Sequence, residues 1–309
     1  VNNVRARLSN GGDLFAISSS SGGYITPANA GPAVSGIYTA GVWIGGVDRA
    51  GEIKLSAVTY KSEGSDFFAG PLDLNGTSEN TICAQWDKIF SVKGTNIRQH
   101  IKNFEIAKEN GTTLSCNDIS DDILYWPAQG NPYFEEEYGW QLPDQTLAGY
   151  VDIDNNGYYD PCFGDFPMLY MDGCDYDKFI PTEINYFVFN DNGGPQRLSG
   201  PRSIQMEMHV NAFAYSTNDE LNDMTFYEYK MTNKANEDLI DCYFAWWVDP
   251  DLGCYNDDYL GCDPDLGMAY IYNEDALDGF ENGCQGVSTY GENIPIIGID
   301  FFRGPSVTK

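Results

Sequence analysis

The chain has few positively charged residues and almost no histidine. Its 309 residues include 17 Lys and Arg against 46 Asp and Glu, and only two His, so the formal net charge is −29. Nucleic acids and anionic membrane surfaces are bound mainly through Lys and Arg. The composition therefore argues against both classes of partner.

The sequence also lacks the long apolar run, of about eighteen residues or more, that a membrane-spanning helix needs. No signal peptide is visible at the start. Val1 begins directly on sequence of folded character, as we expect of a processed N-terminus.

The motifs of common enzyme classes are absent, among them G-x-S-x-G, the Walker loop and H-E-x-x-H. We interpret His100 and His209 as ordinary polar positions on a helix and a strand, not as partners of a nucleophilic cysteine. A carboxylate pair for glycoside hydrolysis stays open, because acidic candidates are plentiful and none stands out as the acid or the base. The sequence favours a non-catalytic protein without deciding the question.

None of the eight cysteines forms a C-x-x-C pair, and two histidines cannot complete several zinc sites, so a transition-metal site is not expected. Disulfides formed in an oxidising compartment are the preferred interpretation, and buried free thiols are the alternative. The spacing leaves the connectivity open. The local pairs to consider are Cys83–Cys116, Cys162–Cys174 and Cys254–Cys262.

Acidic residues are concentrated in two segments. Residues 109–177 and 235–302 each hold fifteen Asp or Glu and no Lys or Arg. Carboxylates at that density repel one another unless salt screens them or divalent cations bind them.

The clearest motif lies in the first of these segments, at 152–167, with the sequence DIDNNGYYDPCFGDFP. Its alternating Asp and Asn followed by Gly157 match the start of a D-x-[DN]-x-[DN]-G calcium loop. The expected ligands of a structural Ca²⁺ ion are Asp152, Asp154, Asn156, the backbone carbonyl of Tyr158, Asp160 and Asp165.

This loop departs from an EF-hand at its end. Position twelve is Phe163 where a bidentate Glu is needed, and the flanking residues are not helical in character. Asp165 is the nearest replacement for that Glu. The alternative is a polar surface loop of Asx turns that binds no ion.

Two further sets of residues are candidates for binding. A second calcium site could draw on the acidic residues that follow an apolar run near residue 248, namely Asp249, Asp251, Asp257, Asp258 and Asp263. Trp126 and Trp140 are the candidates for a platform on which sugar rings could stack. Trp246 and Trp247 are expected in the core instead.

Alternating apolar and polar residues dominate the periodicity. They predict strands at 36–47, 52–60, 184–190, 203–216, 225–232 and 239–248. The apolar run at 242–248 is expected to be a central strand, covered on both faces. Helices are expected at 95–110 and 120–127, and a loop at 131–145. The predicted fold class is mainly β, a β-sandwich or jelly-roll-like fold with one or two short helices.

We divide the chain into three parts. Residues 1–35 are expected to form an extended N-terminal arm whose spare backbone hydrogen bonds could add a strand to a neighbouring sheet. Residues 36–148 are expected to form a mixed β domain that includes the helix at 95–110. Residues 149–309 are expected to form a β-sandwich with the calcium loops. One large domain is the alternative.

The chain resembles the N-terminal region of large secreted surface proteins of Bacteroidota that end in a type IX secretion sorting domain. The blocks that carry the resemblance are NNVRARLSNGGDLF (2–15), AGVWIGGVDRAGEIKLSAVTY (40–60), DFFAGPLDL (66–74), DIDNNGYYDPCFGDFP (152–167), TNDELNDMTFYEYKMTN (217–233), WVDPDLGCYNDDYLGCD (247–263) and GIDFFRGP (298–305). The resemblance implies an exported protein of the cell surface or extracellular space, of which this chain is one part. It also implies that the cysteines at 162, 174 and 254 are additions that form local disulfides.

Taken together, these observations predict an extracellular structural or adhesive surface protein, stabilised by calcium and disulfides. It could assemble with copies of itself, or with other surface proteins, into a filament or surface layer. The alternative is a secreted module that binds or hydrolyses carbohydrate, with a polysaccharide as its partner.

Overall fold

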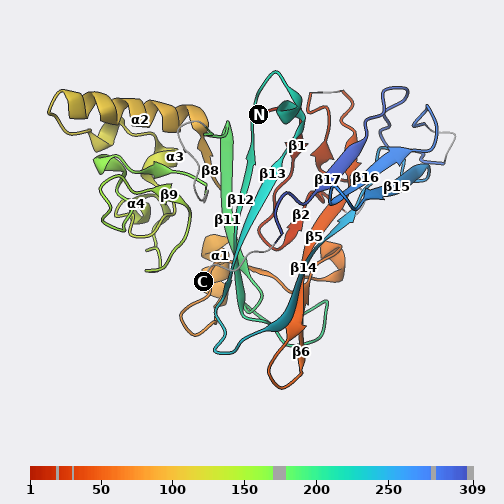
Figure 1. Cartoon of the computed structure of the whole chain (residues 1–309), viewed down its shortest axis with the longest axis horizontal. Coiled ribbons are helices and arrows are strands. Elements are labelled where there is room, and N and C mark those ends of the chain that lie inside the picture. The colour runs from red at the N-terminus through yellow and green to blue at the C-terminus, as the bar shows by residue number, and fades with distance from the viewer. Residues whose placement is uncertain (19–20, 30, 170–178, 280–282, 305–309) are drawn as a thin grey trace. The chain divides into compact units, whose positions relative to one another are not determined.

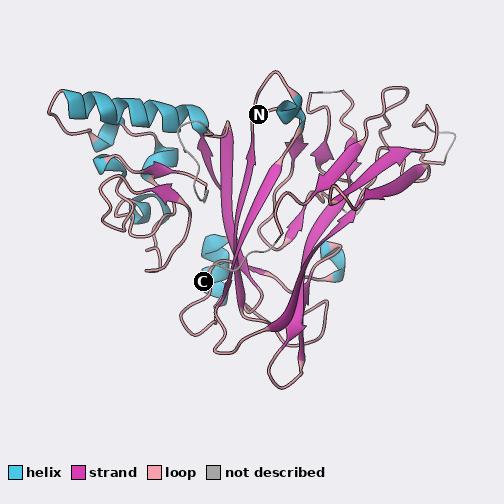
Figure 2. Cartoon of the chain, viewed as in Figure 1, coloured by secondary structure: helices cyan, strands magenta, loops and turns pink. Residues whose placement is uncertain are grey.

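The computed structural model describes residues 1–18, 21–29, 31–169, 179–279 and 283–304 (Figure 1). Strands make up most of its regular structure, and they form antiparallel sheets (Figure 2). The prediction of a mainly β fold is confirmed. Within the described ranges, no helix has both the length and the apolar character needed to cross a membrane.

The chain forms two compact units, each built from separate stretches of sequence. Unit 1 consists of residues 85–188 and 208–232 together with Val1, and unit 2 consists of residues 2–84, 189–207 and 233–309. The boundaries do not follow the expected division near residue 149. Two of them fall within long strands, β11 (Glu183–Asn190) and β12 (Met206–Ala214), each of which contributes residues to both units.

The sheet of unit 1 has the strand order β13-β12-β11, with β8 paired to β11. β8 is Phe90–Lys93 and β13 is Phe226–Asn233. The alternation predicted for β12 is present, but both of its faces are buried. Two of its polar side chains have partners within the sheet: His209 Nδ1 lies 2.7 Å from the Tyr186 hydroxyl, and Asn211 Nδ2 donates to Glu228 Oε2 at 2.8 Å.

Four α-helices occur among the described residues, more than the one or two expected. They are α1 (Asn80–Trp86), α2 (Gly94–Glu109), α3 (Asp121–Leu124) and α4 (Phe134–Tyr138). The predicted helix at 95–110 is confirmed as α2, which lies against β8 (Figure 1) and buries Ile97. The helix predicted at 120–127 is a single turn, and α4 lies where we expected a loop.

Short elements complete unit 1. They are the 3₁₀ turns η2 (Cys116–Asp118), η3 (Pro161–Phe163) and η5 (Glu220–Asp223), and the paired strands β9 (Tyr150–Val151) and β10 (Phe166–Pro167).

Three groups of strands build unit 2. The first sheet has the order β1-β3-β4, formed by Arg5–Ala6, Tyr24–Ile25 and Ser35–Ile37. The second has the order β14-β5-β2 with β6 also on β5, formed by β14 (Ile240–Asp249), β5 (Thr39–Val47), β2 (Asp13–Leu14) and β6 (Ile53–Ala57). The third has the order β15-β16-β17, formed by Asp258–Asp263, Met268–Asn273 and Ile297–Asp300. In addition, β7 (Phe68–Ala69) pairs with the end of β11, and η1 spans Lys61–Glu63.

The expectation that the extended N-terminal arm, residues 1–35, has spare backbone hydrogen bonds is wrong. Strand β2 pairs with β5 through the registers Asp13↔Gly41 and Leu14↔Ala40, and β1 and β3 pair with each other. Leu14 and Phe15 are each only 2% exposed. The segment therefore belongs to the core of unit 2, and its strands already use the backbone groups that we expected to be spare.

The expectation that residues 242–248 form a fully covered strand is also wrong. In the described part of the chain, β14 is the last strand of its sheet and pairs only with β5. Tyr243 is 76% exposed and Ile240 is 43% exposed. An unbroken apolar run is therefore compatible with an edge strand, because the run by itself does not say how many neighbours the strand has.

One buried carboxylate holds two parts of unit 2 together. Asp66 is fully buried and accepts hydrogen bonds of 2.7–3.1 Å from the backbone N–H groups of Ala57, Arg197, Leu198 and Ser199. Burial alone would raise the pKa of Asp66, but these donors lower it below its ordinary value.

We expect Asp66→Asn to lower the free energy of unfolding by about 3 kcal/mol at pH 7, because an amide cannot accept from four donors. A depressed pKa stabilises the fold above the unfolded-state value of about 3.9, and this contribution is lost as the pH falls through the folded-state value. Urea unfolding at pH 7 and pH 3.5 should therefore show a smaller difference between the variant and the parent chain at the lower pH. A difference that stays constant between these two pH values would contradict this account.

Candidate metal centre

Three of the expected calcium ligands come together in unit 1. Carboxylate oxygens of Asp152, Asp154 and Asp165 all lie within 4.8 Å of one another. Asp165 is 1% exposed, and its two oxygens accept hydrogen bonds from Ile153 N and Asp160 N, each at 2.8 Å. The residue that the sequence offered only as a replacement for the missing Glu is thus the buried and most firmly held member of the group.

The turn from Asp152 to Gly157 is held by its own side chains. Asp152 accepts from Asn156 N at 3.2 Å and from Gly157 N at 2.8 Å, and Asp154 accepts from Asn156 N at 3.1 Å. Gly157 has a φ of 83°, a left-handed conformation that glycine adopts without strain. These Asx-type bonds point the outer carboxylates toward Asp165.

The other expected ligands have separate roles. Asn156 Oδ1 accepts from Tyr158 N at 2.7 Å, and the Tyr158 side chain is 53% exposed. Asp160 caps η3 by accepting from Cys162 N at 3.2 Å. The structure therefore places Asp160 beside the three-carboxylate group and gives it a capping bond of its own.

The three carboxylates concentrate negative charge at a site that is partly shielded from solvent. Burial raises the pKa of Asp165 to about 6, and the nearby charges of Asp152 and Asp154 add to this effect. Burial also raises the pKa of Asp160. Such carboxylates become more stable as anions if a cation binds between them.

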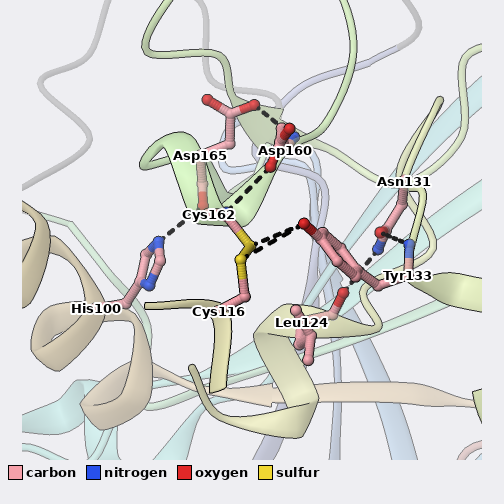
Figure 3. The surroundings of a disulfide bond; sticks show 8 residues. All are labelled: His100, Cys116, Leu124, Asn131, Tyr133, Asp160, Cys162 and Asp165. Carbon is pink, nitrogen blue, oxygen red and sulfur yellow. Dashed lines mark hydrogen bonds between the residues drawn. A yellow bond between two sulfur atoms is a disulfide. The ribbon is translucent and has the colours of Figure 1, made fainter. Parts of the chain in front are cut away.

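A disulfide fixes the far side of this loop. Cys162 of η3 is bonded to Cys116 of η2, and the Tyr133 hydroxyl lies 3.1 Å and 3.5 Å from the two sulfurs (Figure 3). His100 of α2 donates from Nε2 to the Asp165 carbonyl at 3.0 Å (Figure 3). The loop is therefore attached to a helix and to a second turn, independently of any ion.

The local cysteine pairs considered from the sequence are wrong. The described disulfides are Cys116–Cys162 and Cys254–Cys284, which join residues 46 and 30 positions apart. Cys83 and Cys262 are free thiols, as is Cys242, and Cys174 lies outside the described residues. Cys262 cannot reach Cys254 because it is held on strand β15 with its side chain exposed, whereas Cys254 is fully buried against Cys284.

The second expected set of acidic residues does not assemble as a whole. Asp249 ends β14, where it accepts from the Tyr60 hydroxyl at 2.7 Å, and Asp263 caps its own turn by accepting from Asp265 N at 3.0 Å. Asp257 lies elsewhere, in a buried group with Asp278, a residue that we did not select from the sequence. Asp258 is half-buried, and the charges of Asp257 and Asp278 act on it. The charge of Asp251 acts on Asp258, so it lies at the margin of that group.

The proposed sugar platform is not available. Trp126 is 2% exposed, and its Nε1 donates to the Gly149 carbonyl at 3.0 Å. Trp140 is partly buried and packs against Trp86 and Phe134, with ring centroids 4.9 and 4.8 Å apart. The expectation of a stacking platform is therefore wrong for Trp126, which is buried, while Trp140 keeps part of its surface exposed.

No family model, no curated protein and no solved structure matches the chain.

Proposed function

We propose that this chain is an extracellular structural or adhesive module, stabilised by calcium and disulfides, that associates with copies of itself or with other surface proteins. The observation that carries the calcium part is the convergence of Asp152, Asp154 and Asp165 in one loop. Oxygen ligands of this kind, on a turn that is already ordered, are what Ca²⁺ requires.

The two disulfides support the extracellular part of the proposal. Cys116–Cys162 and Cys254–Cys284 each close a long loop, one in each unit. Such bonds persist in oxidising surroundings, and they are rare where thiols are kept reduced. The resemblance to secreted surface proteins of Bacteroidota agrees with this placement.

The edge strand β14 supports association. It is the terminal strand of its sheet among the described residues, and it exposes Ile240 and Tyr243. A long edge strand with exposed apolar side chains is a surface to which another strand can add. This strand replaces the N-terminal arm as the element through which copies could join.

The carbohydrate alternative was motivated by an exposed platform of Trp126 and Trp140 and by the acidic loops. Trp126 is buried and Trp140 is partly buried against Trp86, so only the acidic loops still support it. The structural proposal is therefore preferred.

We expect calcium to raise the melting temperature of the chain. At a calcium concentration about one hundred times the dissociation constant, binding adds about 2.7 kcal/mol of stability, or roughly 5–10 °C in melting temperature. Asp154→Asn should reduce this gain by about half or more, because Asp154 is an exposed side chain that contributes to calcium binding but little to the stability of the calcium-free fold. Thermal unfolding in 10 mM calcium and in chelator measures both effects.

The matched control is Asp118→Asn, an exposed acid of unit 1 outside the loop, which should keep the full gain. Light scattering on the same samples tests association: calcium-bound chain at high concentration should form larger species than chain in chelator. A chain that melts at the same temperature in calcium and in chelator refutes the calcium part, and one that stays monomeric in calcium at high concentration refutes self-association.

A further inference from the structure

A second group of acidic side chains, in unit 2, joins residues that are distant in the sequence. Carboxylate oxygens of Asp257 and Asp278 lie within 4.8 Å of each other, and the two residues are 3% and 0% exposed. Asn273, the last residue of β16, donates from Nδ2 to Asp257 Oδ2 at 3.2 Å. Asp258 follows directly and begins β15.

Backbone donors hold this group in place. Asp278 accepts from Cys254 N at 2.9 Å and from Tyr290 N at 2.6 Å, one on each oxygen. Asp258 Oδ2 accepts from Leu252 N at 2.9 Å. Because Cys254 is bonded to Cys284, the loop that supplies one of these donors is itself fixed.

Two oxygens in the group are left without a donor. Asp258 Oδ1 and Asn273 Oδ1 are both shielded from solvent, and neither accepts a hydrogen bond from the described residues. Buried acceptors of this kind are rare in folded proteins, since they lose water and gain nothing in return. Oxygens that meet no proton donor are the groups that a hard cation binds.

The charge of the group also lacks compensation from its own part of the chain. The charges of Asp257 and Asp278 act on Asp258, and residues 235–302 contain no Lys or Arg to compensate them.

We propose that Asp257, Asp258, Asp278 and Asn273 form a second site, which binds a calcium ion. All four offer oxygen, and Cys254, whose sulfur is also close, is in a disulfide and cannot act as a thiolate ligand. A bound ion would join β15, β16 and the segment around Asp278 beside the Cys254–Cys284 bond. The site does not depend on the loop at 152–165, which lies in the other unit.

Asp258→Asn tests this site without removing the acceptor that Leu252 N needs. Isothermal titration of the full chain with calcium chloride at pH 7.5 should show that the variant loses one bound equivalent, or binds it at least about tenfold more weakly. The difference in melting temperature between the variant and the parent chain should have opposite signs in chelator and in calcium. In chelator the variant should be as stable as the parent chain or more stable, because repulsion is relieved, and in calcium it should be less stable.

The matched control is Asp265→Asn, an exposed acid in the turn between β15 and β16, which should leave calcium binding unchanged. Unaltered stoichiometry and affinity in Asp258→Asn would overturn the second site, and so would lower stability of this variant in chelator. Titration of Asp154→Asn reports on the loop at 152–165 separately. If Asp154→Asn loses one bound calcium ion and Asp258→Asn loses none, the proposed function stands and only the second site is rejected.

Discussion

Replacing Cys116 and Cys162 together by alanine is expected to lower the free energy of unfolding by about 4 kcal/mol. The bond joins residues 46 positions apart, and a loop of that size restricts the unfolded chain by about this amount. The melting temperature should fall by about 10 °C or more. Thermal unfolding without reductant measures the effect, and the parent chain with reductant, which also loses the Cys254–Cys284 bond, should be at least as strongly destabilised.

Cys262→Ala is the matched control, because Cys262 is an exposed free thiol on β15. We expect a change within about 0.5 kcal/mol. If the double variant is as stable as this control, the Cys116–Cys162 bond does not hold unit 1 together.

The same double variant links the disulfide to the candidate metal centre. Cys162 lies in η3, between Asp160 and Asp165, and the bond to Cys116 fixes that turn. Without the bond, Asp165 has to be ordered when the ion binds, so calcium affinity should fall as well as stability. Weaker calcium binding in Cys116→Ala/Cys162→Ala than in Cys262→Ala would show this coupling.

Local patterns predicted the elements that depend on neighbouring residues. The helix at 95–110, the hairpin of β5 and β6, and the alternation of β12 follow from spacing over a few positions. The turn at 152–157 follows in the same way, because each Asp bonds to N–H groups within five residues of itself. Such features need no knowledge of the rest of the fold.

Features that depend on distant segments could not be predicted in this way. Asp278 joins Asp257 across a hairpin, and Cys254 pairs with Cys284 instead of the nearer Cys262. Strand β14 carries the apolar composition of a central strand but lies at an edge, since composition does not fix the number of neighbours. The numbers of cysteine and aspartate residues predicted disulfide bonds and acidic cation sites, but the tertiary structure decides which residues form them.

Trp126 shows the same limit at a single residue, and its replacement has a large expected effect. The segment after α3 contains Pro127 and Gly130, and this pattern is typical of an exposed loop. In the structure, the Trp126 ring is 2% exposed, lies 6.0 Å from the Tyr186 ring, and donates to the Gly149 carbonyl. It therefore connects the loop to strand β11 and to the start of β9.

We expect Trp126→Ala to lower the free energy of unfolding by about 3–5 kcal/mol, because it opens a large cavity and removes one of the two donors to the Gly149 carbonyl, the other being Met168 N. The matched control is Phe179→Ala, an aromatic residue of unit 1 that is 51% exposed, with an expected loss below about 1 kcal/mol. Urea unfolding of the two variants measures the contrast. If Trp126 were instead a binding platform, its replacement would leave stability close to that of the Phe179 variant. A large loss of stability confined to Trp126→Ala would establish the ring as a structural centre of unit 1, and would leave the acidic loops as the surface on which function is to be sought.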